Sequence, residues 1–240
     1  MSLLEVARAR EAAGHDVIHL EIGEPDFPTP APVIAAGQQA LAAGHTRYTP
    51  AAGLPALREA IAGHYAEHFG ARVDPARIIV TPGASGALLL ASQLLVQRGD
   101  RVLMADPTYP CNRHFMALAE AELDTVAVGP DSGWQLDAAL IERHWRDETR
   151  LAMLATPSNP TGHTLDAGQI AAVAETVAAR QGALLVDEIY QGLTYGVAPV
   201  SATAVAPEAY VVNSFSKYFG MTGWRLGWLV APEEAVEPLT

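Results

Sequence analysis

The sequence predicts an α/β fold of three layers, in which helices cover both faces of a mostly parallel sheet of seven strands. After Asp74-Pro75, short and almost continuously apolar runs alternate with segments of helical composition. Strands that are buried on both faces are apolar along their whole length, and this is typical of parallel sheets. Ligands of such sheets bind at the carboxyl ends of the strands.

The apolar runs supply the expected strands, which are Ile78–Val80, Arg101–Ala105, Leu123–Val128, Leu151–Ala155, Ala183–Val186, Tyr210–Asn213 and Leu226–Val230. The helices expected between several of them are Gly86–Gln97, Arg113–Glu120, Leu136–Trp145 and Ala167–Arg180.

The segment before Asp74 has a different character. The helices expected there are Leu3–Ala13, Val33–Ala43 and Leu54–Phe69, and Val17–Ile22 is a short β-like run. Gly14 is expected to end the first helix. Three prolines between Gly23 and Pro30 forbid regular structure and predict a fixed, extended strap. We therefore divide the chain into an arm and strap, residues 1–30, and a large domain, residues 31–240.

Composition and charge exclude several partners. The chain carries 15 basic and 27 acidic residues, a net charge of −12. The electric field of this negative charge repels phosphate backbones and anionic lipid, so neither nucleic acid nor a membrane is expected to bind. Cys111 is the only cysteine, which predicts a reducing compartment. Without a signal peptide or a long apolar run, we expect a cytoplasmic protein. His15 and His19 have no third ligand nearby, so no metal site is predicted.

Polar and glycine residues follow five of the expected strands directly. These segments are Thr81–Gly86, Asp106–Pro110, Thr156–Gly162, Asp187–Tyr190 and Ser214–Lys217. Because the carboxyl ends of parallel strands meet at one edge of a sheet, we expect the five segments to converge on one site.

Lys217 is the candidate nucleophile of that site. A lysine that attacks a carbonyl must be neutral, and burial or a cationic neighbour lowers its pKa. Arg225 lies eight positions further along the chain and could supply the positive charge. The alternative is an ordinary surface lysine, but its position after an apolar run favours a functional role.

A phosphate group could bind where the helix after Thr81 begins. The segment Gly83-Ala84-Ser85-Gly86 offers backbone N–H donors at a helix start, and Ser85 adds a hydroxyl. Many glycine-rich turns between strand and helix bind nothing, so this segment alone leaves both readings open.

The remaining candidates could surround an aromatic ring. Asp187 ends a buried strand and needs a cationic partner, such as a protonated pyridine nitrogen, or serves as a helix cap. Tyr190 and Asn159 could hydrogen-bond a phenolate oxygen, and Tyr109 could stack on a ring face. Turn formation or core packing is the alternative for each of these three.

Seven motifs occur in an order that is specific when taken together. They are Glu21–Pro30, Arg47–Gly53, Thr81–Gly86, Asp106–Pro110, Ser158–Gly162, Asp187–Tyr190 and Ser214–Gly227. On these motifs the sequence resembles the class I and II aminotransferases, which are fold-type I enzymes that depend on pyridoxal 5′-phosphate (PLP). The resemblance makes residues 31–240 the PLP-binding domain.

The resemblance implies a role for each matching residue. Lys217 would form the internal aldimine with PLP and move the substrate proton. Asp187 would face the pyridine nitrogen, and Asn159 with Tyr190 would face the 3′-oxygen. The residues that would hold the phosphate are Ala84, Ser85, Ser214 and Arg225.

Four further features are implied in the same way. Tyr109 would stack on the cofactor ring, and Gly23 with Asn159 would contact the substrate. Tyr48 would reach the phosphate of a neighbouring subunit, which makes a homodimer with shared active sites expected. Members of the family continue into a smaller domain that supplies an arginine for the substrate carboxylate. We expect that domain to be absent from this chain, which ends at Thr240.

The reaction implied is transamination, in which an amino group passes between an amino acid and a 2-oxo acid. Three alternatives remain at this point. A PLP-dependent carbon–sulfur β-lyase shares nearly every motif, and a PLP-sensing regulator would carry an additional DNA-binding module. The third alternative is a truncated PLP-binding fragment with little activity.

Overall fold

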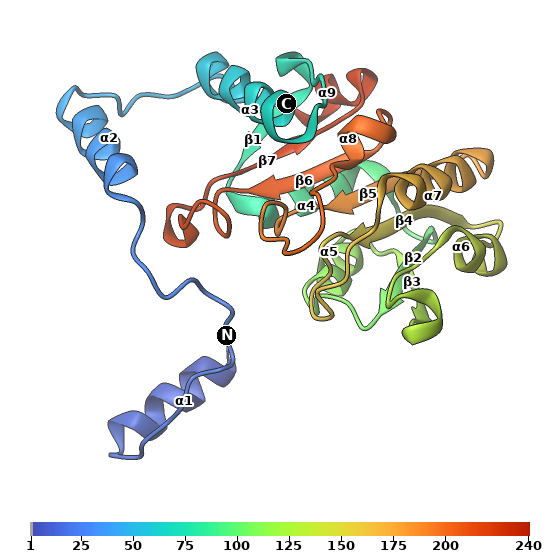
Figure 1. Ribbon diagram of the computed structural model, residues 1–240, viewed down its shortest axis with the longest axis horizontal. Helices are drawn as coiled ribbons and strands as arrows, with labels where there is room; N and C mark the ends of the chain where they lie inside the picture. The colour runs from blue at the N-terminus through green and yellow to red at the C-terminus, as the bar shows by residue number, and fades with distance from the viewer. Residues whose placement is uncertain (1) are drawn as a thin grey trace.

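The computed structural model describes residues 2–240 and has one seven-stranded sheet with helices on both faces (Figure 1). The strand order is β1-β7-β6-β5-β4-β2-β3. The strands are β1 (Ile78–Thr81), β2 (Arg101–Asp106), β3 (Glu122–Ala127), β4 (Thr149–Ala155), β5 (Ala183–Asp187), β6 (Tyr210–Ser214) and β7 (Gly227–Val230). All seven predicted apolar runs form strands, and each predicted boundary is right to within two residues.

The strand directions confirm the mostly parallel sheet. The pairs β2–β3, β2–β4, β4–β5 and β5–β6 are parallel, while β7 pairs antiparallel with both β1 and β6. Since β7 is antiparallel to both neighbours, β1 runs in the same direction as β6. The carboxyl ends of six strands therefore lie at one edge of the sheet together with the start of β7. We call this edge the site edge.

The helices lie in two layers. They are α3 (Pro55–Phe69), α4 (Gly83–Leu95), α5 (Asn112–Leu118), α6 (Ala138–His144), α7 (Ala167–Ala179), α8 (Ala202–Val205) and α9 (Glu233–Leu239). Helices α3, α6, α7 and α8 supply buried residues to one core, and α4, α5 and α9 to the other. The three-layer prediction is therefore confirmed.

Alternation along a strand explains why the strands are apolar throughout. In β5, Leu184 and Val186 belong to one core, and Leu185 between them belongs to the other. Successive side chains of a strand point to opposite faces, so a strand covered on both sides buries every residue. Burial of each such Leu or Val side chain stabilises the fold by about 1.5–3 kcal/mol.

The N-terminal part lies away from the sheet (Figure 1). It contains α1 (Ser2–Ala12) and α2 (Ala31–Ala42), and α2 has no buried residue. The predicted β-like run Val17–Ile22 is wrong, because these residues form no strand and Ile18 and Leu20 are 83% and 88% exposed. A strand requires a neighbour for its backbone hydrogen bonds, and none of the strands in residues 2–240 pairs with this run.

The strap is irregular, as its prolines predicted. Residues 21–30 contain neither helix nor strand, and they run between α1 and α2 (Figure 1). The division of the chain into domains at residue 30 stays a prediction. Within residues 2–240, none of the helices has both the length and the apolar character needed to cross a bilayer.

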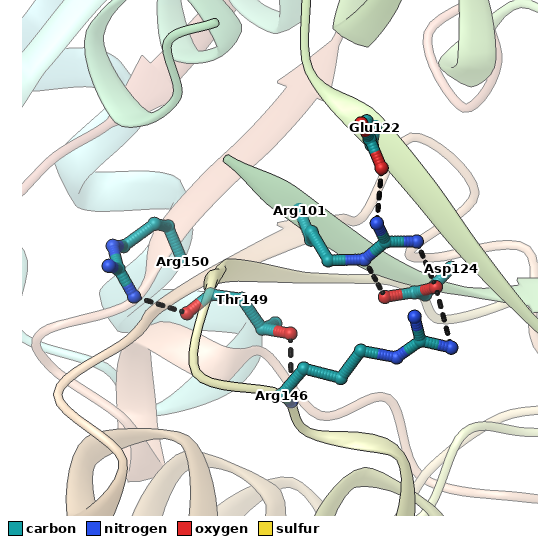
Figure 2. A network of polar contacts seen from close by, with 6 residues as sticks. All are labelled: Arg101, Glu122, Asp124, Arg146, Thr149 and Arg150. Carbon is teal, nitrogen blue, oxygen red and sulfur yellow. Dashed lines mark hydrogen bonds and ion pairs between the residues drawn. The ribbon is translucent and has the colours of Figure 1, made fainter. Parts of the chain in front are cut away.

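A polar network stabilises the sheet away from the site edge (Figure 2). Arg101, at the start of β2, donates two hydrogen bonds of 2.6 Å to the carboxylate of Asp124 in β3. It also pairs with Glu122, and Arg146 lies 3.4 Å from Asp124. The Arg101 hydrogen bonds hold the pKa of Asp124 below its usual value. This bidentate pair joins the first residue of β2 to the third residue of β3, its parallel neighbour.

Candidate active site

Lys217 lies just beyond β6 at the site edge. Its Nζ donates a hydrogen bond to the carbonyl oxygen of Gly23 in the strap and lies 6.0 Å from the ring centre of Tyr190. Burial lowers the pKa of Lys217, Glu24 opposes that shift, and Arg225 adds to it. The cationic influence expected of Arg225 is therefore present, and the surroundings favour a neutral amine.

Lys217 is also the only lysine among the 240 residues, against fourteen arginines. The sequence reasoning overlooked this count, although it is visible without a structure. Apart from the N-terminal amine, Lys217 is therefore the only primary amine through which this chain can react with an aldehyde.

Asp187 is the last residue of β5 and is 6% exposed. Its Oδ1 accepts a hydrogen bond of 3.0 Å from the backbone N–H of Ile189. No cation pairs with its carboxylate in the part of the chain that the structure describes. Burial raises the pKa of Asp187 to about 6. A buried acid without a cation is suited to a ligand that brings one.

Tyr190, Asn159 and Tyr109 lie around Asp187. The Nδ2 of Asn159 donates a hydrogen bond of 3.3 Å to the hydroxyl of Tyr190. The pKa of Tyr109 is raised to about 12, first by a hydrogen bond with Cys111, then by burial and by the nearby Tyr190 and Asp187. The structure therefore brings these side chains, predicted from separate motifs, to one place.

Helix α4 begins at Gly83, three residues before the predicted start. The first backbone N–H groups of any helix have no intrahelical acceptor. Here the N-cap residue is Pro82, which provides no side-chain acceptor for them either. Ala84 is buried and Ser85 is exposed within this first turn. A Cβ atom on Gly83 would lie 2.4 Å from a guanidinium nitrogen of Arg225. The uncapped helix start and the arginine are therefore neighbours.

Ser214 closes the other side of this helix start. Its hydroxyl donates to the carbonyl oxygen of Leu226 at 3.0 Å and lies 2.8 Å from the hydroxyl of Ser216. A Cβ atom on Gly227 would lie 2.6 Å from the carbonyl carbon of Gly83 and 2.9 Å from the carbonyl oxygen of Asn213. Only glycine permits this close approach of β7 to the start of α4 and the end of β6.

Tyr48 is the predicted residue that the structure does not bring to the site. Its side chain is fully exposed. Its expected place was the phosphate of a neighbouring subunit, and the geometry of one chain does not test that role.

Sequence reasoning missed Glu188, which lies directly behind the site. Glu188 is completely buried, and its carboxylate accepts hydrogen bonds from the Ser201 hydroxyl at 2.8 Å and the Ala202 N–H at 2.6 Å. Burial raises the pKa of Glu188 to about 8. The residue ties the turn that carries Asp187 to the start of α8. The sequence does contain a signal for this residue, because Glu188 is an acid inside the otherwise apolar segment of residues 183–190.

Trp224 and Trp228, which lie just before and within β7, have different surroundings. Trp228 is 1% exposed and Trp224 is 44% exposed. The Trp224 ring lies against α2, where a Cβ atom on Gly37 would meet it at 2.8 Å. Trp224 therefore packs against the N-terminal part of the chain.

Comparison with known proteins places this geometry in a family. Residues 15–240 match the family described as aminotransferase class I and II. A valine–pyruvate aminotransferase of Mycobacterium tuberculosis is 38% identical over 245 residues, and the match covers 100% of this chain and 63% of the relative. An aspartate aminotransferase of Geobacillus stearothermophilus is 35% identical, with 100% of this chain and 62% of the relative covered.

Solved structures agree with the sequence matches. A crystal structure of an aminotransferase from Mycobacterium tuberculosis has a TM-score of 0.94 at 37% identity, covering 100% of this chain and 62% of that one. An aspartate aminotransferase from Thermus thermophilus with maleate has a TM-score of 0.94 at 33% identity, covering 99% and 63%. This chain thus spans a little under two thirds of the length of these proteins.

Proposed function

Because this chain belongs to the class I and II aminotransferase family, we propose that it binds PLP at the site edge and transfers an amino group between an amino acid and a 2-oxo acid. The observation that carries the proposal is the setting of its only lysine. Lys217 follows β6 at the same edge of the sheet as Asp187, a buried carboxylate without a cation among residues 2–240, and as the uncapped start of α4 with Arg225 beside it.

The phosphate end of PLP fits the start of α4. A phosphate dianion needs N–H donors and at least one cation. The free N–H groups of Ala84 and Ser85 would supply donors, together with the Ser85 hydroxyl. The Ser214 hydroxyl would join them by exchanging its hydrogen bond to the Leu226 carbonyl oxygen for one to the phosphate. Arg225 would supply the cation, because its guanidinium already lies against Gly83.

The ring end of PLP fits Asp187. A protonated pyridine nitrogen would give this carboxylate the cation that it lacks, and the pair would form out of water, where its interaction is strong. Asn159 and Tyr190, already hydrogen-bonded to each other, would direct an N–H and an O–H toward the 3′-oxygen. Tyr109 would cover one ring face.

Lys217 would hold the cofactor and handle the proton. Burial and Arg225 favour the neutral amine, which is the form that attacks a carbonyl carbon. When bound, PLP supplies an electron sink beside the substrate Cα. Lys217 Nζ, once free of the cofactor, is the base that would remove and return the Cα proton. Asp187 would keep the ring nitrogen protonated throughout.

The direct test uses the single lysine. The 240-residue chain is incubated with PLP, reduced with borohydride and digested, and the labelled peptide is identified by mass spectrometry. We expect the label on Lys217 in the parent and only on the N-terminal amine in Lys217→Arg. A parent labelled only at the N-terminus would overturn the proposed cofactor site.

Amino-group transfer is tested separately, because the cofactor site and the reaction can fail independently. The loaded chain is given an amino acid with and without a 2-oxo acid. Transamination requires the second substrate for turnover. Release of pyruvate and ammonia without an acceptor would instead indicate the β-lyase reaction.

We also propose that a second copy of the chain completes the site. Tyr48 is fully exposed, and the arm before it exposes apolar side chains that include Ile18, Leu20 and Phe27. Large exposed apolar surfaces mark interaction sites. Light scattering at several concentrations tests this, and a parent that stays monomeric at high concentration would contradict it.

A further inference from the structure

The strap contacts the body of the protein at one place. Among the described residues, the hydrogen bonds that join residues 21–30 to residues 55–240 all go to the loop of residues 217–224. This loop contains Lys217 and ends beside Arg225. The strap and the candidate active site therefore share one support.

Thr29 forms the end of this contact that is farther from Lys217 along the strap. Its hydroxyl donates to the carbonyl oxygen of Gly220 at 2.9 Å and accepts from the indole N–H of Trp224 at 3.1 Å. A threonine hydroxyl has one donor and can accept, so both functions are used. The partners lie 191 and 195 positions along the chain, so these are tertiary contacts.

Glu24 and Gly23 form the end of the contact that lies at Lys217. The carboxylate of Glu24 accepts a hydrogen bond of 2.5 Å from the hydroxyl of Thr222, and the carbonyl oxygen of Gly23 accepts one from Lys217. The carbonyl oxygen of Thr222 in turn accepts from Arg225 at 2.9 Å. This end thus contacts Lys217 directly through Gly23 and is linked to Arg225 through Thr222.

The prolines make the two ends act together. Pro25, Pro28 and Pro30 each fix the φ angle of the backbone, so the segment between Gly23 and Thr29 has few alternative conformations. A stiff segment that is fixed at one end has a defined position at the other. Among residues 2–240, no hydrogen bond other than these four joins residues 21–30 to residues 55–240.

We propose that Thr29 is a positioning residue, whose hydroxyl fixes the strap on the loop of residues 217–224 and so holds the Gly23 carbonyl against the Lys217 amine. The functional meaning rests on the proposed role of Lys217. Loss of the hydroxyl opens the strap and leaves Lys217 without its acceptor and its cover.

Two measurements on the chain without PLP test this. The first is the rate of cleavage after Glu21 by a glutamate-specific protease, which reports strap opening. The second is the rate of acylation of Lys217 by acetic anhydride, which is read from one peptide because the chain has one lysine. When opening is fast, both rates follow the population of the open state.

Thr29→Val keeps the shape of the side chain and removes the hydroxyl. We expect both rates to rise by a similar factor, about 5- to 30-fold, because Thr29→Val removes both the hydrogen bond to Gly220 and the one from Trp224. Thr29→Ser retains the hydroxyl and should return both rates to the parent values. The matched control is Thr176→Val, which removes a hydroxyl–carbonyl hydrogen bond within α7 and should change neither rate.

Faster cleavage without faster acylation would show that Thr29 holds the strap but does not position Gly23, and would overturn the proposal. No change in either rate would overturn it as well. If Thr29→Val does not fold, Thr222→Val removes the other hydroxyl contact and should raise both rates. Failure of PLP labelling in the parent is a separate outcome, which removes the proposed function and leaves these two rates unaffected.

Discussion

The guanidinium of Arg225 lies against the backbone of Gly83 and occupies the space that a side chain at position 83 would need. A Cβ atom on Gly83 would come within 2.4 Å of a guanidinium nitrogen, and both residues have left-handed backbones, with φ of +70° and +53°. The arginine therefore reaches the start of α4 only because position 83 has no side chain. The pair is the geometric basis of the proposed phosphate site.

Gly83→Ala should displace Arg225 and weaken PLP binding. A hydrogen bond to a charged group contributes about 1.5–3 kcal/mol, so we expect the dissociation constant to rise about 10- to 100-fold. The measurement is a PLP titration followed by the visible absorbance of the bound cofactor. Gly70→Ala is the control, because Gly70 has a similar φ of +63° and its Cβ would meet nothing within 4 Å. Equal affinities in the two variants would show that the contact with Arg225 is irrelevant to binding.

Asp187 should make the stability of the PLP-free chain depend on pH. Burial raises its pKa from 3.8 to about 6, so the folded chain binds this proton more tightly than the unfolded chain does. The stabilisation is complete below pH 3.8 and is lost as the pH rises through about 6. Two pKa units correspond to about 3 kcal/mol as an upper limit.

Urea unfolding at a series of pH values checks this, with Asp187→Asn as the reference that cannot titrate. We expect the free energy of unfolding of the parent to fall relative to that of the variant as the pH rises from 3.8 through about 6. PLP should reverse the trend, because a cationic ring nitrogen stabilises the ionised carboxylate. A parent and variant with parallel pH profiles would mean that Asp187 titrates normally.

The sheet could be predicted because its physical signal is local. Strands buried on both faces are apolar at every position, and Ala183–Val186 shows this as clearly in the sequence as in β5. The same reasoning failed at Val17–Ile22, where apolar residues form no strand. Apolar character alone does not predict a strand, and within residues 2–240 no other strand pairs with this run.

The site residues could be predicted where they directly follow a strand. Asp187 ends β5 and Lys217 follows β6, and the parallel arrangement brings those ends together. Thr29 and Trp224 could not be placed, because they contact each other across 195 positions of the sequence. The direction of β7 was also hidden, although it explains how Arg225, which precedes that strand, reaches the same edge.

The Arg101–Asp124 pair should contribute to stability and not to cofactor binding. Asp124→Asn removes a bidentate, charge-assisted contact that is mostly shielded from water, and we expect a loss of about 1–3 kcal/mol in the free energy of unfolding. Arg101 lowers the pKa of Asp124, so this contribution is present above the unfolded pKa of about 3.8 and disappears as the pH falls through the folded value.

Urea unfolding at neutral and acid pH measures that loss. The control is Glu142→Gln, which breaks the ion pair with Arg180 and should cost much less, because this pair is exposed to water. PLP labelling of Lys217 should be unchanged in both variants, because neither pair lies at the site edge. Reduced labelling in Asp124→Asn alone would show that this end of the sheet affects the site.

Glu188 should stabilise the turn that carries Asp187 and Tyr190. Glu188→Ala leaves the Ser201 hydroxyl and the Ala202 N–H buried without an acceptor, and we expect the free energy of unfolding to fall by about 3 kcal/mol. Ser201→Ala removes one of the two donors and should cost about 1 kcal/mol. Urea unfolding of both variants and of the double variant separates the shared contact from the rest, because the two losses should not add. Additive losses would show that Glu188 acts through contacts other than Ser201, and the hydrogen bond to Ala202 would then be the one that holds the turn.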